Sequence, residues 1–300
     1  MLKKAYLLAI ALFSISDTFA QTTFLPLGTE NYHVLDRLET RSGKLCDSLS
    51  LWDRPEARRN AVNFLESIKD RNNKKDVKPW LSNVDRYNVT QMISESGEWA
   101  PKNEETIDSR KAWLKFFYKK QYDFIHIKTH DFFLDNNFFL VVNPVINSVA
   151  MYQQNSPAAP SYVKSTRFYS GRGAELRGWI GKKVGFYTSI TDNQEQYPYF
   201  VENWIKKNNK LTAVPGADNY KNVKQGNFDY MQATGYINFD VVKNHLNVTF
   251  GRGKHFIGDG ISSLFLTDNS ANMTYLQLQA RIWKLNYECL YVELAPSSIA

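Results

Sequence analysis

The chain has little cysteine and no motif that marks a metal or redox site. Only Cys46 and Cys289 occur in 300 residues, which is too few for the disulfide scaffold of a small secreted domain. No CxxC or HExxH occurs, and the five histidines do not cluster as zinc ligands would. His126 and His130 are four residues apart, but in an expected strand that spacing only puts them on one face. We therefore expect two unpaired thiols, no metal and no other cofactor.

Long apolar runs and a dominant charge of one sign are also missing. The mean hydropathy of −0.44 excludes a polytopic helical membrane protein, which needs runs of about 20 apolar residues. It leaves open a transmembrane β-barrel, whose strands are only half apolar. The 37 Lys and Arg against 30 Asp and Glu give a net charge of +7, and the basic residues are scattered. No nucleic-acid partner is expected, and no Ser-His-Asp arrangement suggests catalysis.

The N-terminus carries the pattern of a secretory signal peptide. A cationic head, Met1 to Lys4, precedes the apolar run from Ala5 to Ile15. The small residues around Thr18 and Ala20 are typical of a cleavage site, so we predict cleavage after Ala20. The mature protein is expected to begin at Gln21 and to leave the cytoplasm.

Between about residues 32 and 118 the apolar spacing is helical. Asp53 to Glu56 is predicted to start a helix, with Asp at the N-cap and Pro in the first turn. Its apolar stripe comprises Ala57, Ala61, Phe64, Leu65 and Ile68. A second helix fits residues 82–93, with Val84, Tyr87 and Met92 as its apolar residues, and a third starts near residue 108. We expect a helical domain over residues 21–120.

From about residue 123 the period changes to two, as in strands with one apolar and one polar face. In one such segment Leu246, Val248 and Phe250 alternate with Asn247, Thr249 and Gly251. Residues 121–300 are therefore expected to form antiparallel strands. On their polar face, which would line a lumen, we place Arg167, Glu175, Arg177, Gln277 and Arg281.

Two features favour a membrane barrel over a soluble sandwich, which would also alternate. The segment from Thr274 to Leu294 has almost no breaker, whereas soluble strands usually run about five or six residues. Aromatic residues recur towards strand ends, as an interfacial girdle requires: Trp179, Tyr187, Trp204, Trp283 and Tyr291. The predicted fold is all-β with a small helical N-terminal part, namely an antiparallel outer-membrane β-barrel preceded by a short helical bundle.

Several stretches resemble the Wzi-type capsule-assembly outer-membrane proteins and the related RemB proteins of gliding motility. The most specific is Phe250 to Gly260 (FGRGKHFIGDG), followed by Ser262 to Asn269 (SSLFLTDN). Ser262 stands where relatives often have Arg. Further similar stretches are residues 32–38, 117–120, 131–133, 139–144 and 275–283.

The resemblance implies a helical domain at the periplasmic base of an outer-membrane barrel whose loops engage surface polysaccharide. It implies surface polysaccharide and outer-membrane lipid as partners, with other envelope or motility proteins as further ones, and it does not imply an enzyme. The family barrel needs roughly twice the seven or eight strands counted here. The chain is therefore expected to be an N-terminal piece whose barrel is incomplete.

Candidate glycan contacts are charged and aromatic residues in expected turns and loops. They are Arg252, Lys254, Asp259, Tyr197 and Tyr199. The glycines around Arg252 lack the spacing of a phosphate-binding loop and are better explained by close backbone contact within a sheet. A solvated turn is the alternative for the charged residues, and interfacial anchoring is the alternative for the tyrosines. A pore for small solutes is the alternative function, and a barrel hydrolase is a third.

Overall fold

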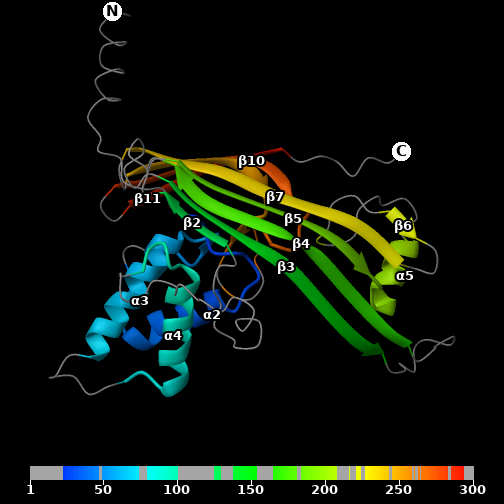
Figure 1. Ribbon diagram of the computed structural model, residues 1–300, viewed down its shortest axis with the longest axis horizontal. Helices are drawn as coiled ribbons and strands as arrows, with labels where there is room; N and C mark the ends of the chain where they lie inside the picture. Colours follow the sequence, from blue (N-terminus) through cyan, green and yellow to red (C-terminus); the bar gives the residue numbers. More distant parts are fainter. Residues whose placement is uncertain are drawn as a thin grey trace, which may run out of the picture.

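The computed structural model describes residues 23–46, 49–73, 80–100, 125–129, 138–153, 165–180, 184–207, 216, 221–223, 227–242, 245–258, 260, 263, 265–282 and 285–293. These residues form a large antiparallel sheet with a group of three helices beneath one end of it (Figure 1). In the chain, the three helices precede the strands of this sheet.

The principal sheet has nine strands in the order β11-β10-β8-β7-β5-β4-β3-β2, with β6 paired to β7 beside that path. Its strands are β2 (Ile125–Thr129), β3 (Phe138–Gln153), β4 (Ser165–Ile180), β5 (Val184–Glu195), β6 (Lys221–Val223), β7 (Asn227–Val242), β8 (Leu246–Gly253), β10 (Met273–Ile282) and β11 (Leu285–Glu293). All the pairings are antiparallel. Such a meander suits strands joined by short local connections.

The sheet is open in the part of the chain that the structure describes. β2 and β11 are its two edges, and no pairing joins them there. The structure therefore establishes a mainly antiparallel β protein with a few helices, without the closure that defines a barrel. The expected long strand from residue 274 to 294 is two strands, because β10 ends at Ile282 and β11 begins at Leu285.

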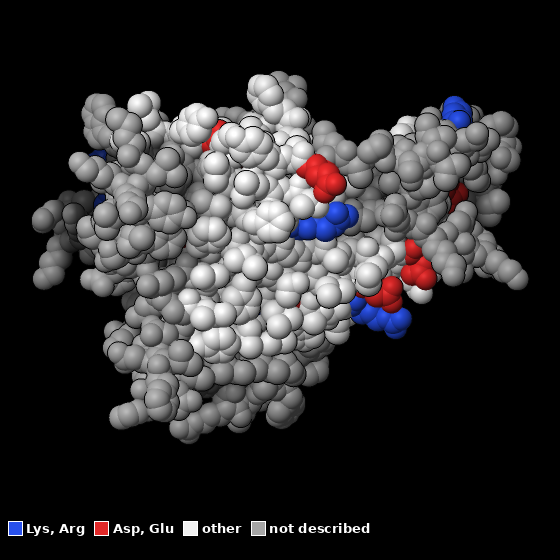
Figure 2. All heavy atoms as spheres, turned by 90° about the horizontal axis from the view of Figure 1, so that it is seen from above, with Lys and Arg blue, Asp and Glu red and all other residues white. Residues whose placement is uncertain are grey.

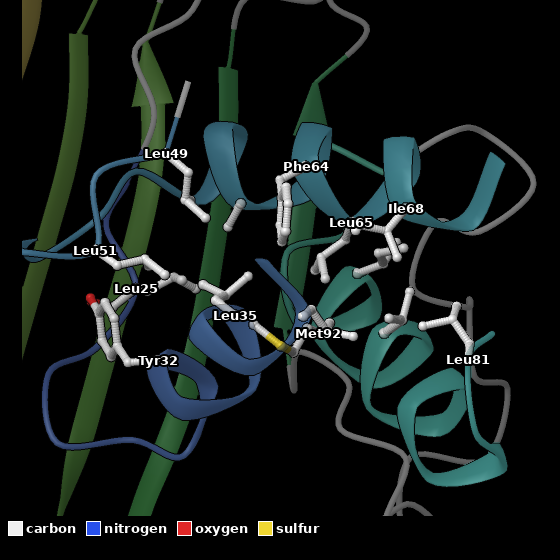
Figure 3. Close-up of a cluster of buried hydrophobic side chains, with 14 residues drawn as sticks. Leu25, Tyr32, Leu35, Leu49, Leu51, Phe64, Leu65, Ile68, Leu81 and Met92 are labelled. Carbon is white, nitrogen blue, oxygen red and sulfur yellow. The ribbon is translucent and has the colours of Figure 1, made fainter. Parts of the chain in front are cut away.

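The helices α2 (Asn31–Ser42), α3 (Arg58–Asn72) and α4 (Asn83–Glu95) share one hydrophobic core (Figure 3). The predicted stripe of α3 is confirmed at Ala61, Phe64, Leu65 and Ile68, which are all buried. Ala57, its fifth member, lies in the N-cap position and is half-buried. Among the residues that pack against it are Leu25, Tyr32, Leu35, Leu38, Leu81 and Met92. This core lies within the helical group, away from the apolar face of the sheet.

Polar contacts fix the start of α4, whose N-cap is Ser82, the residue at which the helix was expected to begin. The Ser82 hydroxyl accepts a hydrogen bond from the Asp85 backbone N–H, and the Asp85 carboxylate accepts one from the Ser82 N–H. Asp85 also pairs with Arg37 and Arg41 of α2. Burial of Asp85 opposes its ionisation, but Ser82 and the two arginines outweigh this effect and lower its pKa.

The apolar face predicted for α4 is only partly right. Val84 and Tyr87 are exposed, while Met92 is buried together with Val89 and Ile93. The prediction chose Val84 and Tyr87 because they are apolar. Which face of α4 is buried depends on the contacts with α2 and α3, and these contacts cover Val89, Met92 and Ile93 instead.

The predicted start of α3 is wrong. Asp53 belongs to the two-residue strand β1 (Asp53–Arg54), which pairs with β9 (Phe256–Ile257). The helix begins at Arg58, with Ala57 in the N-cap position. Asp53 Oδ2 instead accepts a hydrogen bond from Gln279 of β10, 3.2 Å away. The Asp53 carboxylate, which the local sequence pattern assigned to the helix cap, is therefore engaged in a tertiary hydrogen bond.

The region expected to contain only strands also contains a helix. α5 (Tyr199–Lys207) lies at the end of the sheet opposite the three-helix group (Figure 1). Arg167 of β4 ties it to the sheet through Glu202, with Nη1 and Oε1 2.7 Å apart. The third helix expected near residue 108 lies outside the described residues. No helix in the described part of the chain is long and apolar enough to cross a membrane.

Candidate functional site

The outward face of the sheet, on the side away from the three-helix group, is apolar. Its large side chains alternate along each strand with polar ones that point inward, and many are strongly exposed. Ile237 and Phe250 are 51% and 55% exposed, and Ile282 and Leu285 are 67% and 72% exposed. Figure 2, which looks down on the molecule from above, shows a broad area without charged side chains. This is the reverse of a soluble sheet, whose exposed face is polar.

The apolar surface has a defined border. Towards the hairpin turns at Ile180, Leu246 and Ile282, the described outward positions of β3 to β11 carry no charged residue. Charged residues begin at Arg252, and at the exposed pair of Arg172 with Asp192, whose nitrogen and oxygen are 3.2 Å apart. On β10 the uncharged outward positions cover Thr274 to Ile282, which is about 26 Å along a strand. We call this surface the outer band.

The inward face is polar and hydrogen-bonded. Glu175 of β4 accepts hydrogen bonds from Asn143 of β3 and Tyr187 of β5. Gln277 of β10 is buried and donates to Glu288 of β11 through Nε2 and Oε1, 2.5 Å apart. Paired polar groups of this kind remove the free-energy cost of burying amides and carboxylates.

Most of the predicted lumen residues lie on this inward face. Arg167, Glu175 and Gln277 contact other inward-facing or α5 groups. Arg177 pairs mainly with Glu98, beyond the end of α4, at 3.3 Å, while its distance to Glu175 is 3.9 Å. The Arg281 side chain lies outside the described residues.

For two of the residues predicted to form the interfacial girdle, the prediction is wrong. Trp179 lies on the inward face and stacks on Phe139, with ring centroids 5.8 Å apart. Tyr187 also points inward and stacks on Tyr236. Each lies an even number of residues from the inward-facing polar positions of its strand. Because side chains alternate between the two faces, both rings must point inward. Tyr291 and Trp204 are exposed, and Trp283 lies outside the described residues.

Several polar contacts join the helical part to the inward face. The Tyr236 hydroxyl accepts a hydrogen bond from the Phe24 backbone N–H at 2.7 Å. Arg177 also donates to the backbone carbonyl of Glu95, the last residue of α4. Burial alone would raise the pKa of Glu98, but the charges of Arg177 and Arg58 outweigh it and hold that pKa below its usual range.

Two cavities lie between the N-terminal segment and the inward face. The smaller, of about 230 Å³, is lined by Arg252 and Lys254 together with Tyr187, Tyr236 and Tyr275. The larger, of about 550 Å³, has Asp53, Glu56, Asp240 and Glu288 in its lining. We call them the basic cavity and the acidic cavity. Phe24 lines both.

The predicted glycan residues are only partly brought together. Lys254 lies at the basic cavity, where its Nζ donates to the Gly216 carbonyl at 2.7 Å, whereas Arg252 borders this cavity from an exposed outward position of β8. The expectation of an exposed loop tyrosine at position 197 is wrong, because Tyr197 packs against Phe228 and Tyr230 and is 7% exposed. Tyr199 begins α5 and is half-buried. Asp259 lies outside the described residues.

Gly251, the first glycine of the FGRGKH stretch, has the role expected from its place in a strand. A Cβ on Gly251 would lie 2.5 Å from the Gly235 carbonyl oxygen of β7. The bare backbone at this position therefore lets β8 approach β7, and no phosphate-binding turn is needed to explain it.

The residues of the acidic cavity were not singled out from the sequence. The period of two predicts that each strand has a polar face, but nothing in it signals that Asp53 approaches that face from a segment far away in the chain. Neither Cys46 nor Cys289 forms a disulfide. Within the residues that the structure describes, no cluster of His, Cys, Asp and Glu could hold a metal ion.

Comparison with the models of known families, with curated proteins and with solved structures found no match to the chain.

Proposed function

We propose that this sheet is part of the wall of an outer-membrane β-barrel that holds or arranges surface polysaccharide. The observation that carries the proposal is the reversal of the two faces, with large apolar side chains exposed and polar side chains enclosed. In water an apolar surface of this extent is unfavourable, at about 25 cal/mol per Å². Against lipid the same surface is favourable, and an outer-membrane barrel carries an apolar band of about 25 Å.

The border of the outer band supports the same proposal. Arg172 and Asp192 are the first charged pair beyond it on β4 and β5. A pair of opposite charges is expected where the strands leave the hydrocarbon, because charged side chains on the lipid face are costly near its midplane. The proposal requires β2 and β11 to be paired in the membrane, since unpaired backbone groups in lipid are unfavourable.

A role in binding polysaccharide, with no chemical turnover, is supported by the resemblance and by the basic cavity. Lys254 and three tyrosine rings line this cavity, and Arg252 borders it from an exposed outward position. Cationic groups suit the carboxylates of an acidic glycan, and the rings offer both apolar faces and hydroxyl donors. Binding there should weaken with ionic strength, since the Debye length falls from about 10 Å at 0.1 M to about 3 Å at 1 M.

A pore for small solutes is the alternative function. It is favoured by the polar inward face and disfavoured by the helical part, which lies against that face through Glu98 and Arg177. Planar-bilayer recording separates the two functions, because a pore conducts steadily and a binding protein does not.

The membrane location is tested with two adjacent labels. Thr188 and Ser189 of β5 face opposite sides of the sheet and are both half-buried. Each is changed to Cys, with Cys46 and Cys289 changed to Ser, and is labelled with a small environment-sensitive fluorophore.

In native membranes, doxyl lipids should quench the label at position 188 strongly and the label at position 189 weakly. Equal quenching at the two positions, or recovery of the protein in the soluble fraction, would contradict the location. The binding role is tested separately, by retention of acidic capsule on cells that lack the gene, with and without an R252A/K254A variant. Unchanged retention in both strains would contradict it.

A further inference from the structure

The acidic cavity has the features of a ligand site that differs from the basic one. It lies between β1 with the start of α3 on one side and the inward face of β7, β8, β10 and β11 on the other. Its volume of about 550 Å³ is within the usual range of small-ligand sites. Trp52 lines it and is 47% exposed, so the cavity is accessible from solvent.

Several residues that line the acidic cavity each carry a buried oxygen atom with no hydrogen-bond partner among the described residues. Asn238 is fully buried, and its Oδ1 is one such atom. Its Nδ2 already donates to Thr249 Oγ1 at 3.2 Å. Asp240 Oδ2 is a second such atom, while Asp240 Oδ1 accepts a hydrogen bond from Asn247. Buried acceptors without a donor are unfavourable, so a molecule that satisfies them must supply hydrogen-bond donors.

The charges in the wall disfavour an anionic ligand. Glu56, Asp240 and Glu288 are acidic, against the basic residues Arg59 and His245. Asp53 adds a further carboxyl group whose pKa is raised to about 9 by burial, by its contact with Glu288 and by the charge of Glu56. Burial and the neighbouring carboxylates therefore favour the protonated form of Asp53. The wall offers acceptors and net negative charge, which favours neutral hydroxyl groups or an amine.

We infer that the acidic cavity binds a sugar unit without negative charge, neutral or aminated, whose hydroxyl or amino groups donate to Asn238 and Asp240. The apolar face of the sugar ring would lie against Trp52. This inference names a ligand class for the polysaccharide-binding role and rests on that proposed function. It assigns the two cavities to opposite kinds of sugar, with acidic units at Arg252 and Lys254 and neutral or basic units here.

Three probes with one ring skeleton test the ligand class: glucose, glucosamine and glucuronate. Their binding to the full-length protein is measured by saturation-transfer NMR in detergent, with ring-proton contacts as the readout. Glucosamine and glucose should bind, and glucuronate should bind more weakly than either. An R252A/K254A variant, in which the basic cavity is disabled, should show the same order.

The variant Asp240→Asn tests the site. It keeps the size of the side chain and replaces a charged acceptor, so affinity for glucosamine should fall by about tenfold or more. Asp192→Asn is the matched control, since it makes the same change on the outward face, and it should leave affinity unchanged. Trp52→Leu changes a half-exposed side chain and should also weaken binding, which keeps the test usable if Asp240→Asn does not fold.

The inference is overturned if glucuronate binds as tightly as glucose in the R252A/K254A variant. It is also overturned if none of the three sugars binds, which would leave the cavity to water, or if both Asp240→Asn and Trp52→Leu bind like the unmodified protein. Failure of the proposed location is distinguishable. In that case the labels at positions 188 and 189 are quenched equally, whether or not sugars bind.

Discussion

The contact between Arg177 and Glu98 is expected to hold the helical part against the sheet. Arg177 Nε lies 3.3 Å from Glu98 Oε1, and the two side chains are 4% and 1% exposed. The change Glu98→Gln preserves shape and removes one charge. It leaves the buried guanidinium of Arg177 without its main counter-ion.

The magnitude follows from what remains around Arg177. Removing one partner of a buried ion pair typically costs about 3–5 kcal/mol. Glu175 stays 3.9 Å from Nη1, and the Glu95 carbonyl still accepts from Nη2 at 3.2 Å. These two contacts compensate in part, so we expect a loss near the lower limit, about 3 kcal/mol.

The loss is measured by urea unfolding of the protein in detergent and by hydrogen exchange of the α4 amides. The control is Asp192→Asn. It breaks the pair between Asp192 of β5 and Arg172 of β4, the strand that also carries Arg177. Those side chains are 77% and 50% exposed, so this change should cost about 0–1 kcal/mol. Changing Arg177 to Met in the Glu98→Gln background should recover part of the loss, because the buried guanidinium of Arg177 is then also removed.

The pair also predicts a dependence on pH. Because the pKa of Glu98 is lowered in the folded state, its contribution is fully present above the unfolded value, about 4.3. It is lost as the pH falls through the folded value. The unmodified protein should lose stability over that acidic range, and Glu98→Gln should lose less. Equal costs for Glu98→Gln and Asp192→Asn, or unchanged exchange in α4, would refute the role of this contact.

Three further predictions concern export, the outer band and α4. Mass spectrometry of the mature protein should find Gln21 at the N-terminus, and an uncleaved chain in the cytoplasm would contradict the signal peptide. Val248→Arg on the outward face should impair assembly by about 2–4 kcal/mol. Asn247→Arg should impair it less, because Asp240 lies within hydrogen-bond reach; equal yields of folded protein in the outer membrane would favour a soluble sheet. Asp85→Ala should destabilise the helical part by about 2 kcal/mol, measured by urea unfolding, because it removes the α4 cap and the partner of two arginines. An unchanged unfolding midpoint would show that the cap contributes little.

The faces of the strands were predictable because a strand alternates residue by residue. Phe250 and Ile237 point outward, and Thr249 and Asn238 point inward, as the period of two requires. The same rule would have placed Trp179 and Tyr187 inward. Their closeness to strand ends suggested the opposite, and parity proved to be the better guide. The buried stripe of α3 follows from an equally local rule, the helical period.

The tertiary structure decided which residues far apart in the sequence are in contact, and no local period contains that information. Asp53 bonds to Gln279, 226 residues away, so a carboxylate expected to cap a helix forms part of a cavity wall. Arg177 and Glu98 meet across 79 residues, and Tyr197 is buried because Phe228 and Tyr230 pack against it. The sequence by itself determined which side chains share a face, since backbone geometry alone sets that. Which faces meet, and which polar atoms they leave without partners, depends on packing between distant segments.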